Sequence, residues 1–329
     1  MGRQGRHKGV SENERAGSSA LPAGMVLGGM ALAGAAAVGG TALLRRFDAW
    51  ALQMITHPER RDVGATPADL GLEYEEVWLR SDDEVDLYGW LIPAPGGAPH
   101  ARATLILGHG YSDTIDSILG PVAYLQPAGY NVLMLNFRAH GRSSGDTSSI
   151  GYLEHQDIAA GLRYLEDRHL GRIGIMGWSL GGAVAIVSAA LYPQIAGVIA
   201  DSTFARLGSP LGQMAAQVLH HPAWLARAEG WYGERLVARS LGYNVTDARP
   251  ETLIGRISPR PILIIHSVED KLIPVANARR LYARAGEPKD LWITPAGDHA
   301  WGPSQEFPDE YRARVLGFWD GVFPAEGGR

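Results

Sequence analysis

Short apolar runs bounded by Gly, Pro or Asp recur along the chain from about residue 70, and segments with apolar residues at three- and four-residue spacing lie between them. Six runs are nearly all apolar, as parallel strands buried on both faces are; they span 104–107, 132–136, 173–176, 198–200, 262–266 and 291–294. The segments with helical spacing span 115–126, 152–168, 180–191, 275–284 and 309–323. This alternation predicts one α/β domain.

Two further segments extend that domain. Runs 74–79 and 85–92 alternate apolar and polar residues on either side of the polar turn 81–84, which predicts an antiparallel pair. The interval 203–257 separates two strands but is far too long for one crossover helix. We therefore expect a mostly parallel central sheet with helices on both faces, in a domain spanning 55–325 with a small helical cap inserted at about 203–257.

The N-terminal region has a different pattern. A polar tail, 1–20, precedes the stretch 21–44, which carries no charge and is followed by Arg45 and Arg46. A helix of that length spans about 36 Å, more than the roughly 30 Å of a bilayer's hydrocarbon core. The stretch predicts a single transmembrane anchor, with the side of the membrane left open. The alternatives are a signal peptide cleaved near 35–37, which would give a secreted protein, and a Gly/Ala linker.

Composition excludes several kinds of chemistry. The chain of 329 residues has no Cys, which rules out disulfides, thiolate metal sites, iron–sulfur clusters and a cysteine nucleophile. The formal net charge of −5 gives no electrostatic footprint for nucleic acid, so nucleic-acid binding is not expected.

The chain contains two matches to G-x-S-x-G, so the pattern alone does not identify a nucleophile. A nucleophile elbow needs a strand ending at the motif and a helix beginning within it, because the sharp turn exposes the serine Oγ above the sheet. The stretch 177–181 around Ser179 follows the apolar run 173–176 and leads into the helical segment from Leu180. The stretch 141–145 around Ser143 leads into a polar loop instead. We predict Ser179 as the nucleophile and Ser143 as a loop serine.

A serine nucleophile needs a base and an orienting acid. Among the 11 histidines, His299 lies in the loop directly after the last predicted strand, where the chain order Ser, Asp, His of this architecture requires the base. Asp270 follows the penultimate strand and is the predicted acid. Asp201 and Glu269 are the alternatives for the acid, whereas Asp298, next to His299 in sequence, is expected to be solvated.

Two backbone N–H groups should stabilise the developing oxyanion. One is that of Leu180, at the helix start, and the other is that of Tyr111, in the loop after the strand at 104–107. His109 in the same loop is expected to be structural. Apolar residues of the cap, Trp224 and Trp231 among them, are candidates for an acyl pocket, with Trp178 beside the nucleophile. Alternatively, the cap residues only pack the cap onto the sheet.

His109-Gly110 after a strand, the motif at 177–181, Asp270 and His299, in that order, resemble the α/β-hydrolase superfamily. The stretch 137–145 is similar to that superfamily's loop after the fourth strand. The stretches 200–204 and 258–261 resemble the membrane-anchored Bem46-like and prolyl-oligopeptidase-type branch. The resemblance implies ester, thioester or amide hydrolysis without a metal or an organic cofactor. No propeller precedes the domain, which disfavours peptidase activity.

These observations predict a membrane-tethered serine hydrolase. The preferred activity is that of a carboxylesterase, which would cleave a small-molecule ester through an acyl-enzyme on Ser179. A thioesterase or peptidase with the same three residues is the enzymatic alternative. A non-catalytic binding protein that keeps the fold is the alternative of another class, and it would need a broken site. The oligomeric state stays open.

Overall fold

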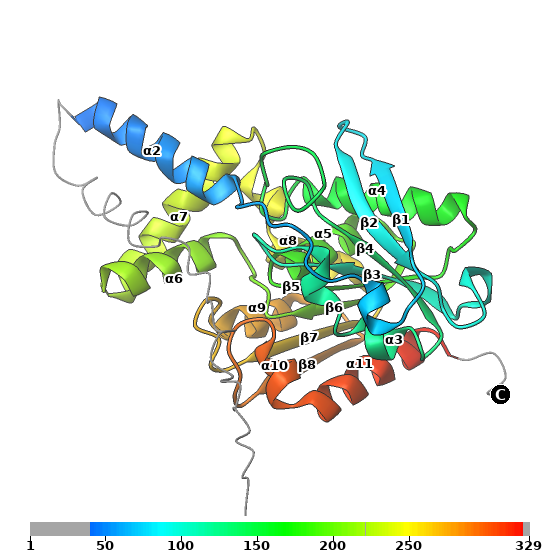
Figure 1. Ribbon diagram of the computed structural model, residues 1–329. Coiled ribbons are helices and arrows are strands. Elements are labelled where there is room, and N and C mark those ends of the chain that lie inside the picture. The colour runs from blue at the N-terminus through cyan, green and yellow to red at the C-terminus, as the bar shows by residue number, and fades with distance from the viewer. Residues whose placement is uncertain (1–39, 221, 325–329) are drawn as a thin grey trace, which may run out of the picture.

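The computed structural model describes residues 40–220 and 222–324. Its centre is one eight-stranded sheet in the order β1-β2-β4-β3-β5-β6-β7-β8 (Figure 1). The strands are β1 (Glu75–Arg80), β2 (Asp86–Ile92), β3 (Ala103–Gly108), β4 (Tyr130–Leu135), β5 (Ile173–Trp178), β6 (Ile195–Asp201), β7 (Ile262–Ser267) and β8 (Lys289–Thr294). β2 runs antiparallel to β1 and to β4, and every other pairing is parallel. The predicted α/β class and mostly parallel sheet are confirmed.

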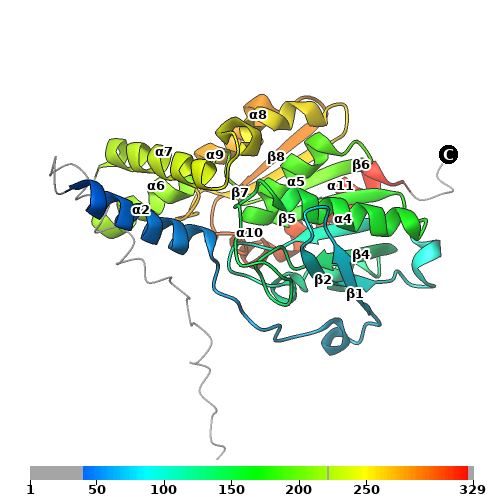
Figure 2. The ribbon, with the colours of Figure 1, turned by 90° about the horizontal axis from the view of Figure 1, so that it is seen from above.

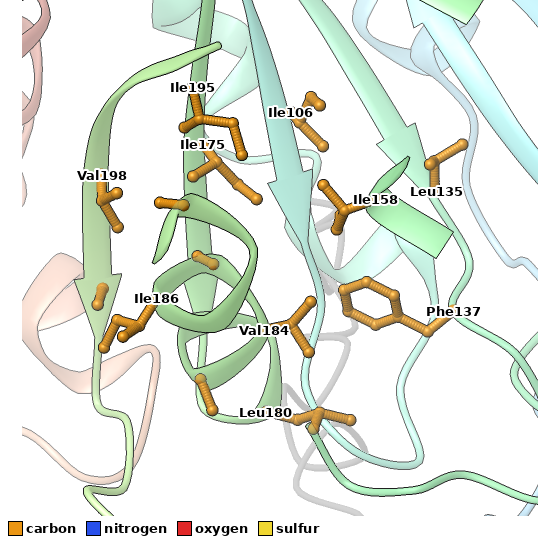
Figure 3. Close-up of a cluster of buried hydrophobic side chains, with 14 of the residues drawn as sticks. Ile106, Leu135, Phe137, Ile158, Ile175, Leu180, Val184, Ile186, Ile195 and Val198 are labelled. Carbon is orange, nitrogen blue, oxygen red and sulfur yellow. The ribbon is translucent and has the colours of Figure 1, made fainter. Parts of the chain in front are cut away.

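Helices cover both faces of the sheet (Figures 1 and 2). One face packs against α4 (Glu154–Asp167), α5 (Leu180–Leu191) and α9 (Ala276–Arg284), and the other against α3 (Val122–Leu125) and α11 (Pro308–Val322). Along β3, Ile106 belongs to the first core while Leu105 and Leu107 belong to the second. This alternation is why the central strands are apolar throughout. Figure 3 shows the first core, where Ile106, Ile175 and Val184 meet between the sheet and α5.

One predicted helix is shorter than expected. The segment 115–126 forms a 3-10 turn, η4 (Ile115–Ile118), followed by the single-turn α3. Gly120 and Pro121 lie between them, and a proline lacks the N–H that a continuous helix would need there. The other four predicted helices match α4, α5, α9 and α11 within about two residues at each end, the usual uncertainty in helix boundaries.

The interval 203–257 is helical, but only its first half stands away from the sheet (Figure 2). α6 (Gly208–Leu219) and α7 (Ala223–Ser240) pack as a hairpin, whereas α8 (Pro250–Leu253) and the 3-10 turn η6 (Ile254–Ile257) pack on α5. A side chain on Gly212 or Gly230 would overlap the backbone of the facing helix, so α6 and α7 approach closely there. The short α10 (Gly302–Glu306) precedes α11.

A further helix, α2 (Gly40–Thr56), packs on α7 (Figures 1 and 2). The Tyr232 hydroxyl on α7 donates a 2.7 Å hydrogen bond to Asp48 Oδ1 on α2. α2 lies largely before residue 55, where the sequence places the start of the domain. Residues 21–39 of the predicted anchor lie outside the described residues, and residues 40–44 begin α2. In the described part of the chain, no helix is both long and apolar enough to cross a bilayer.

Candidate active site

Ser179 lies at the point where β5 ends and α5 begins. Its backbone has φ 56° and ψ −114°, a left-handed conformation that costs energy in a residue with a side chain. The turn is held on both sides, because the Ser179 N–H donates to the Asp201 carbonyl at 2.9 Å and Thr203 Oγ1 donates to the Ser179 carbonyl at 2.8 Å. The strain and its restraints have the geometry of a nucleophile elbow.

The glycines of the motif are required by close backbone approach. A Cβ on Gly177 would overlap the carbonyl group of Gly181, and a Cβ on Gly181 would overlap the carbonyl group of Gly108 on the neighbouring strand. α5 therefore starts in direct contact with the ends of β5 and β3. The G-x-S-x-G spacing reflects this contact at Ser179.

The structure brings Ser179, His299 and Asp270 together from three separate loops at the carboxyl end of the sheet. His299 Nε2 lies 2.9 Å from Ser179 Oγ, and His299 Nδ1 lies 2.8 Å from Asp270 Oδ2. The carboxylate accepts the Nδ1 proton, which leaves Nε2 free to accept the proton of the serine hydroxyl. The His299 side chain is 19% exposed, so the base is accessible while the acid behind it is buried. This arrangement can activate a hydroxyl nucleophile.

Four donors surround the Asp270 carboxylate. Oδ1 accepts the backbone N–H groups of Leu272 at 2.9 Å and Ile273 at 2.7 Å, and Oδ2 faces His299 and His266 Nε2, the latter at 3.3 Å. Burial by itself would raise the pKa of Asp270, but the hydrogen bonds from the two histidines and the backbone outweigh it and hold the pKa well below its usual value. Asp270 is therefore ionised at neutral pH.

His266 contacts the acid and was not singled out from the sequence. It is fully buried at the end of β7, and its Nε2 donates to the Ile273 carbonyl at 2.7 Å. The ring thereby ties the strand to the loop that carries Asp270. In the sequence, the only indication of this contact is that His266 lies four residues before Asp270. Residues four apart along an extended strand do not touch, so this spacing did not predict the contact.

The alternative acids have other partners. Asp201 is fully buried and accepts hydrogen bonds from the Tyr311 hydroxyl at 2.7 Å and the Ser202 hydroxyl at 2.8 Å. Burial raises the pKa of Asp201 to about 7. Glu269 accepts the Gly297 N–H at 3.4 Å, and Asp298 accepts the backbone N–H of His299.

In the described residues, no group of three or more His, Cys, Asp or Glu side chains could hold a metal ion.

Of the two predicted oxyanion donors, Leu180 follows the serine at the start of α5, and Tyr111 lies in the loop after β3. A methyl group on Gly110 would lie 3.8 Å from Ser179 Cβ, so the loop after β3 passes directly over the nucleophile. Within the described chain, the backbone N–H groups of Tyr111 and Leu180 have no acceptor. Both can therefore donate to an oxygen of a bound substrate.

Two buried histidines hold the loop that carries Tyr111. His109 Nδ1 donates to the Gly110 carbonyl at 2.7 Å, and its Nε2 accepts the Phe137 N–H at 3.0 Å. His140 Nδ1 donates to the Arg138 carbonyl at 2.8 Å, and its Nε2 accepts the Ser112 N–H at 3.1 Å. Each ring acts once as donor and once as acceptor, which only the neutral form can do. Burial lowers the pKa of His109 to about 4 and that of His140 to about 3, in agreement with these contacts.

Ser143, the serine of the second motif, is 1% exposed. Its Oγ donates to the Asn136 carbonyl at 2.6 Å and accepts the Tyr88 N–H at 3.0 Å, so it joins the loop after β4 to β2. A hydroxyl used in this way stabilises the loop and is not free to react with a substrate.

The three tryptophans proposed for a pocket differ widely in exposure. Trp224 is 69% exposed and Trp231 is 54% exposed, so most of each ring faces solvent on the outer side of α7. Trp178 is 1% exposed, and its Nε1 donates to the Tyr311 hydroxyl at 3.0 Å in the core beneath the nucleophile. Side-chain direction on an inserted helix depends on how that helix packs, which apolar content does not reveal, and a role of these rings in an acyl pocket stays a prediction.

Comparisons with known proteins agree with this geometry. Residues 99–252 match the family described as serine aminopeptidase, S33. The uncharacterized protein YfhR of Escherichia coli O157:H7 is 30% identical over 272 residues, which cover 82% of this chain and 87% of YfhR. The esterase Pf2001 of Pyrococcus furiosus has a similar structure, with a TM-score of 0.64 and 29% identity over 81% of this chain and 99% of the esterase. The protein bem46 of Schizosaccharomyces pombe is 26% identical over 68% of this chain and 70% of its own length.

Proposed function

This chain belongs to the α/β-hydrolase family, and we propose that it is a serine hydrolase that cleaves carboxylic esters through an acyl-enzyme on Ser179. The observation that carries the proposal is the unbroken chain of contacts from Ser179 Oγ through His299 to Asp270, at 2.9 and 2.8 Å. A binding protein that had merely kept the fold would have no need to maintain this chain of contacts or the strained backbone at Ser179.

In the proposed acylation step, Ser179 Oγ attacks the ester carbonyl carbon and its proton passes to His299 Nε2. Asp270 stabilises the resulting imidazolium, and the N–H groups of Leu180 and Tyr111 donate to the carbonyl oxygen as it becomes negative. The tetrahedral intermediate then collapses, and the alcohol leaves with the proton from His299. Water, deprotonated by His299, attacks the acyl-enzyme in the second half and releases the carboxylic acid and free Ser179.

Similarity to a solved esterase is the reason why we propose ester cleavage and not peptide cleavage. The similar solved structure named above is described as an esterase, with 29% identity over nearly its whole length. The matched family is described as an aminopeptidase, and a thioesterase or peptidase would use the same three residues.

Turnover of matched substrates tests the proposal. The purified chain should hydrolyse p-nitrophenyl acetate and butyrate at least about a hundredfold faster, in kcat/KM, than aminoacyl p-nitroanilides. An acyl-coenzyme A series measured alongside distinguishes a thioesterase. Faster cleavage of the anilides would favour the peptidase alternative, and no turnover of any series together with intact folding would favour the binding protein.

A further inference from the structure

One helix face outside the active site combines exposed aromatic rings with exposed positive charge. On α7 the exposed residues Trp224, Ala228, Trp231, Arg235 and Arg239 follow one another at spacings of four, three, four and four. At 100° per residue these five residues share one side of the helix, and Arg227 borders them. We name this surface, Trp224, Arg227, Ala228, Trp231, Arg235 and Arg239, the α7 face.

All exposed charges of α7 are positive. Its two acidic residues, Glu229 and Glu234, are 6% and 4% exposed, and Glu234 pairs with Arg249 at 2.8 Å. In the described part of the chain, no carboxylate lies within ion-pair distance of Arg235 or Arg239. The Arg235 guanidinium lies 3.8 Å from the centre of the Trp231 ring instead. This local excess of positive charge contrasts with the chain's net charge of −5.

α2, which packs on α7, also has an excess of exposed positive charge. α2 carries exposed Arg45 and Arg46 near its start, and its one acidic residue, Asp48, accepts the Tyr232 hydroxyl. α6, the third helix of this group, has no charged residue. Figures 1 and 2 show α2, α6 and α7 together, projecting from one side of the sheet. In sequence, the last five residues of the uncharged stretch 21–44 form the start of α2.

We propose that the α7 face rests on a lipid bilayer that contains anionic lipids. Tryptophan rings favour the headgroup level of a membrane, and arginines extend their charged ends toward phosphate and carboxylate groups while their stems lie along apolar surface. The arginine charge is complementary to an anionic surface, and in sequence an uncharged segment long enough to enter a bilayer precedes α2, the helix that packs on α7. This proposal is independent of the proposed ester hydrolysis.

Because the chain has no Cys, a single fluorophore can report contact at a chosen residue of the full-length protein. Ala228→Cys places a nitrobenzoxadiazole probe between the two tryptophans without removing either. Ala313→Cys on α11 is the matched control, since Ala313 is also exposed on a helix and lies between Arg312 and Arg314. Each labelled protein is mixed with vesicles of phosphatidylcholine containing about 30% phosphatidylserine and a lipid with a nitroxide on its acyl chain.

We expect the nitroxide to quench the probe at 228 by at least half and the probe at 313 by less than a tenth. Replacing Arg227, Arg235 and Arg239 by Gln, or Trp224 and Trp231 by Ala, should reduce quenching at 228 toward the control value, with circular dichroism unchanged. Binding to vesicles without quenching at 228 would overturn the proposal, because only another part of the chain would then touch the bilayer. Equal quenching at 228 and 313, or quenching that survives both sets of substitutions, would overturn it as well.

Discussion

Buried polar side chains hold the loops at the carboxyl end of the sheet, whereas α2, α6 and α7 pack on one another and leave large aromatic rings exposed. At Ser179 the backbone is strained, Thr203 Oγ1 donates to the Ser179 carbonyl, and Ser179 Oγ lies 2.9 Å from His299 Nε2. On α7, Trp224 and Trp231 are mostly exposed, and among the described residues Tyr232 and Asp48 form a single side-chain hydrogen bond between α7 and α2. The site is determined by many mutually dependent contacts, so single changes there should have far larger effects than single changes in the helical group.

The largest effect should come from the nucleophile. Ser179→Ala removes the attacking oxygen, and we expect kcat/KM on p-nitrophenyl butyrate to fall by a factor on the order of 10⁴ to 10⁶, since the three residues act as a unit. Ser143→Ala is the matched control. It removes two buried hydrogen bonds and should cost about 1–3 kcal/mol in the free energy of unfolding while turnover stays within about tenfold. Reversed effects would identify Ser143 as the nucleophile.

Substitution of the two buried aspartates, Asp270 and Asp201, should have very different effects on kcat. Asp270→Asn keeps the shape of the side chain but removes the charge that holds His299, so we expect kcat to fall by about 10³- to 10⁴-fold. Asp201→Asn should lower kcat by less than about tenfold, because Asp201 contacts Tyr311 and Ser202 and not the base. Stopped-flow or steady-state assays of both variants compare them directly. If Asp201→Asn lowers kcat by about 10³-fold or more and Asp270→Asn lowers it by less than about tenfold, the acid is Asp201 at the end of β6.

His266 should have an intermediate effect as a positioning residue. His266→Leu removes the donor to the Ile273 carbonyl and to Asp270, and kcat should fall by about 10- to 100-fold with KM nearly unchanged. His266→Gln keeps a donor at a similar place and should recover a substantial part of kcat. If both variants lose stability equally and neither changes kcat, His266 serves only the fold of β7.

The two histidines that hold the loop carrying Tyr111 should make the free energy of unfolding depend on pH. His109 and His140 have folded-state pKa values of about 4 and 3, below the unfolded value of about 6.5, so the unfolded chain binds more protons between these limits. Each histidine should therefore lower the free energy of unfolding by about 1.4 kcal/mol per pH unit as the pH falls from about 6.5 toward 4.

Urea unfolding at several pH values measures that slope, and His140→Gln should make it shallower. Asp201, with its pKa raised to about 7, contributes a slope of opposite sign in the same window, but it is present in both proteins and cancels from the comparison. An unchanged slope in His140→Gln would show that this ring is already charged in the folded protein.

The smallest effect should come from the helical group. Tyr232→Phe removes one exposed hydrogen bond between α7 and α2, and the urea midpoint should change by the equivalent of about 0.5 kcal/mol. Tyr74→Phe is a suitable control because its hydroxyl has no partner in the described residues. A loss above about 2 kcal/mol in Tyr232→Phe would mean that α2 is far more tightly coupled to the domain than this one contact suggests.

The same contrast explains what the sequence revealed. Six strands were predictable as nearly continuous apolar runs, and β1 and β2 were predictable as an alternating pair on either side of a polar turn. The elbow was predictable because an apolar run leads into the motif at Ser179 and a helical segment follows it. The contact of His266 with Asp270 and the outward direction of Trp231 were not predictable. Both depend on how separate segments meet in space, and neither leaves a periodic signal in the chain.

Covalent labelling tests the central claim most directly. A fluorophosphonate reacts with a serine that is activated by a base, displacing fluoride and adding one phosphonyl group to Oγ. Intact-protein mass spectrometry should show a single adduct, fragmentation should locate it on Ser179, and His299→Ala should abolish it. An adduct on Ser143 or on any other serine, or an unlabelled protein that still hydrolyses esters, would contradict the account.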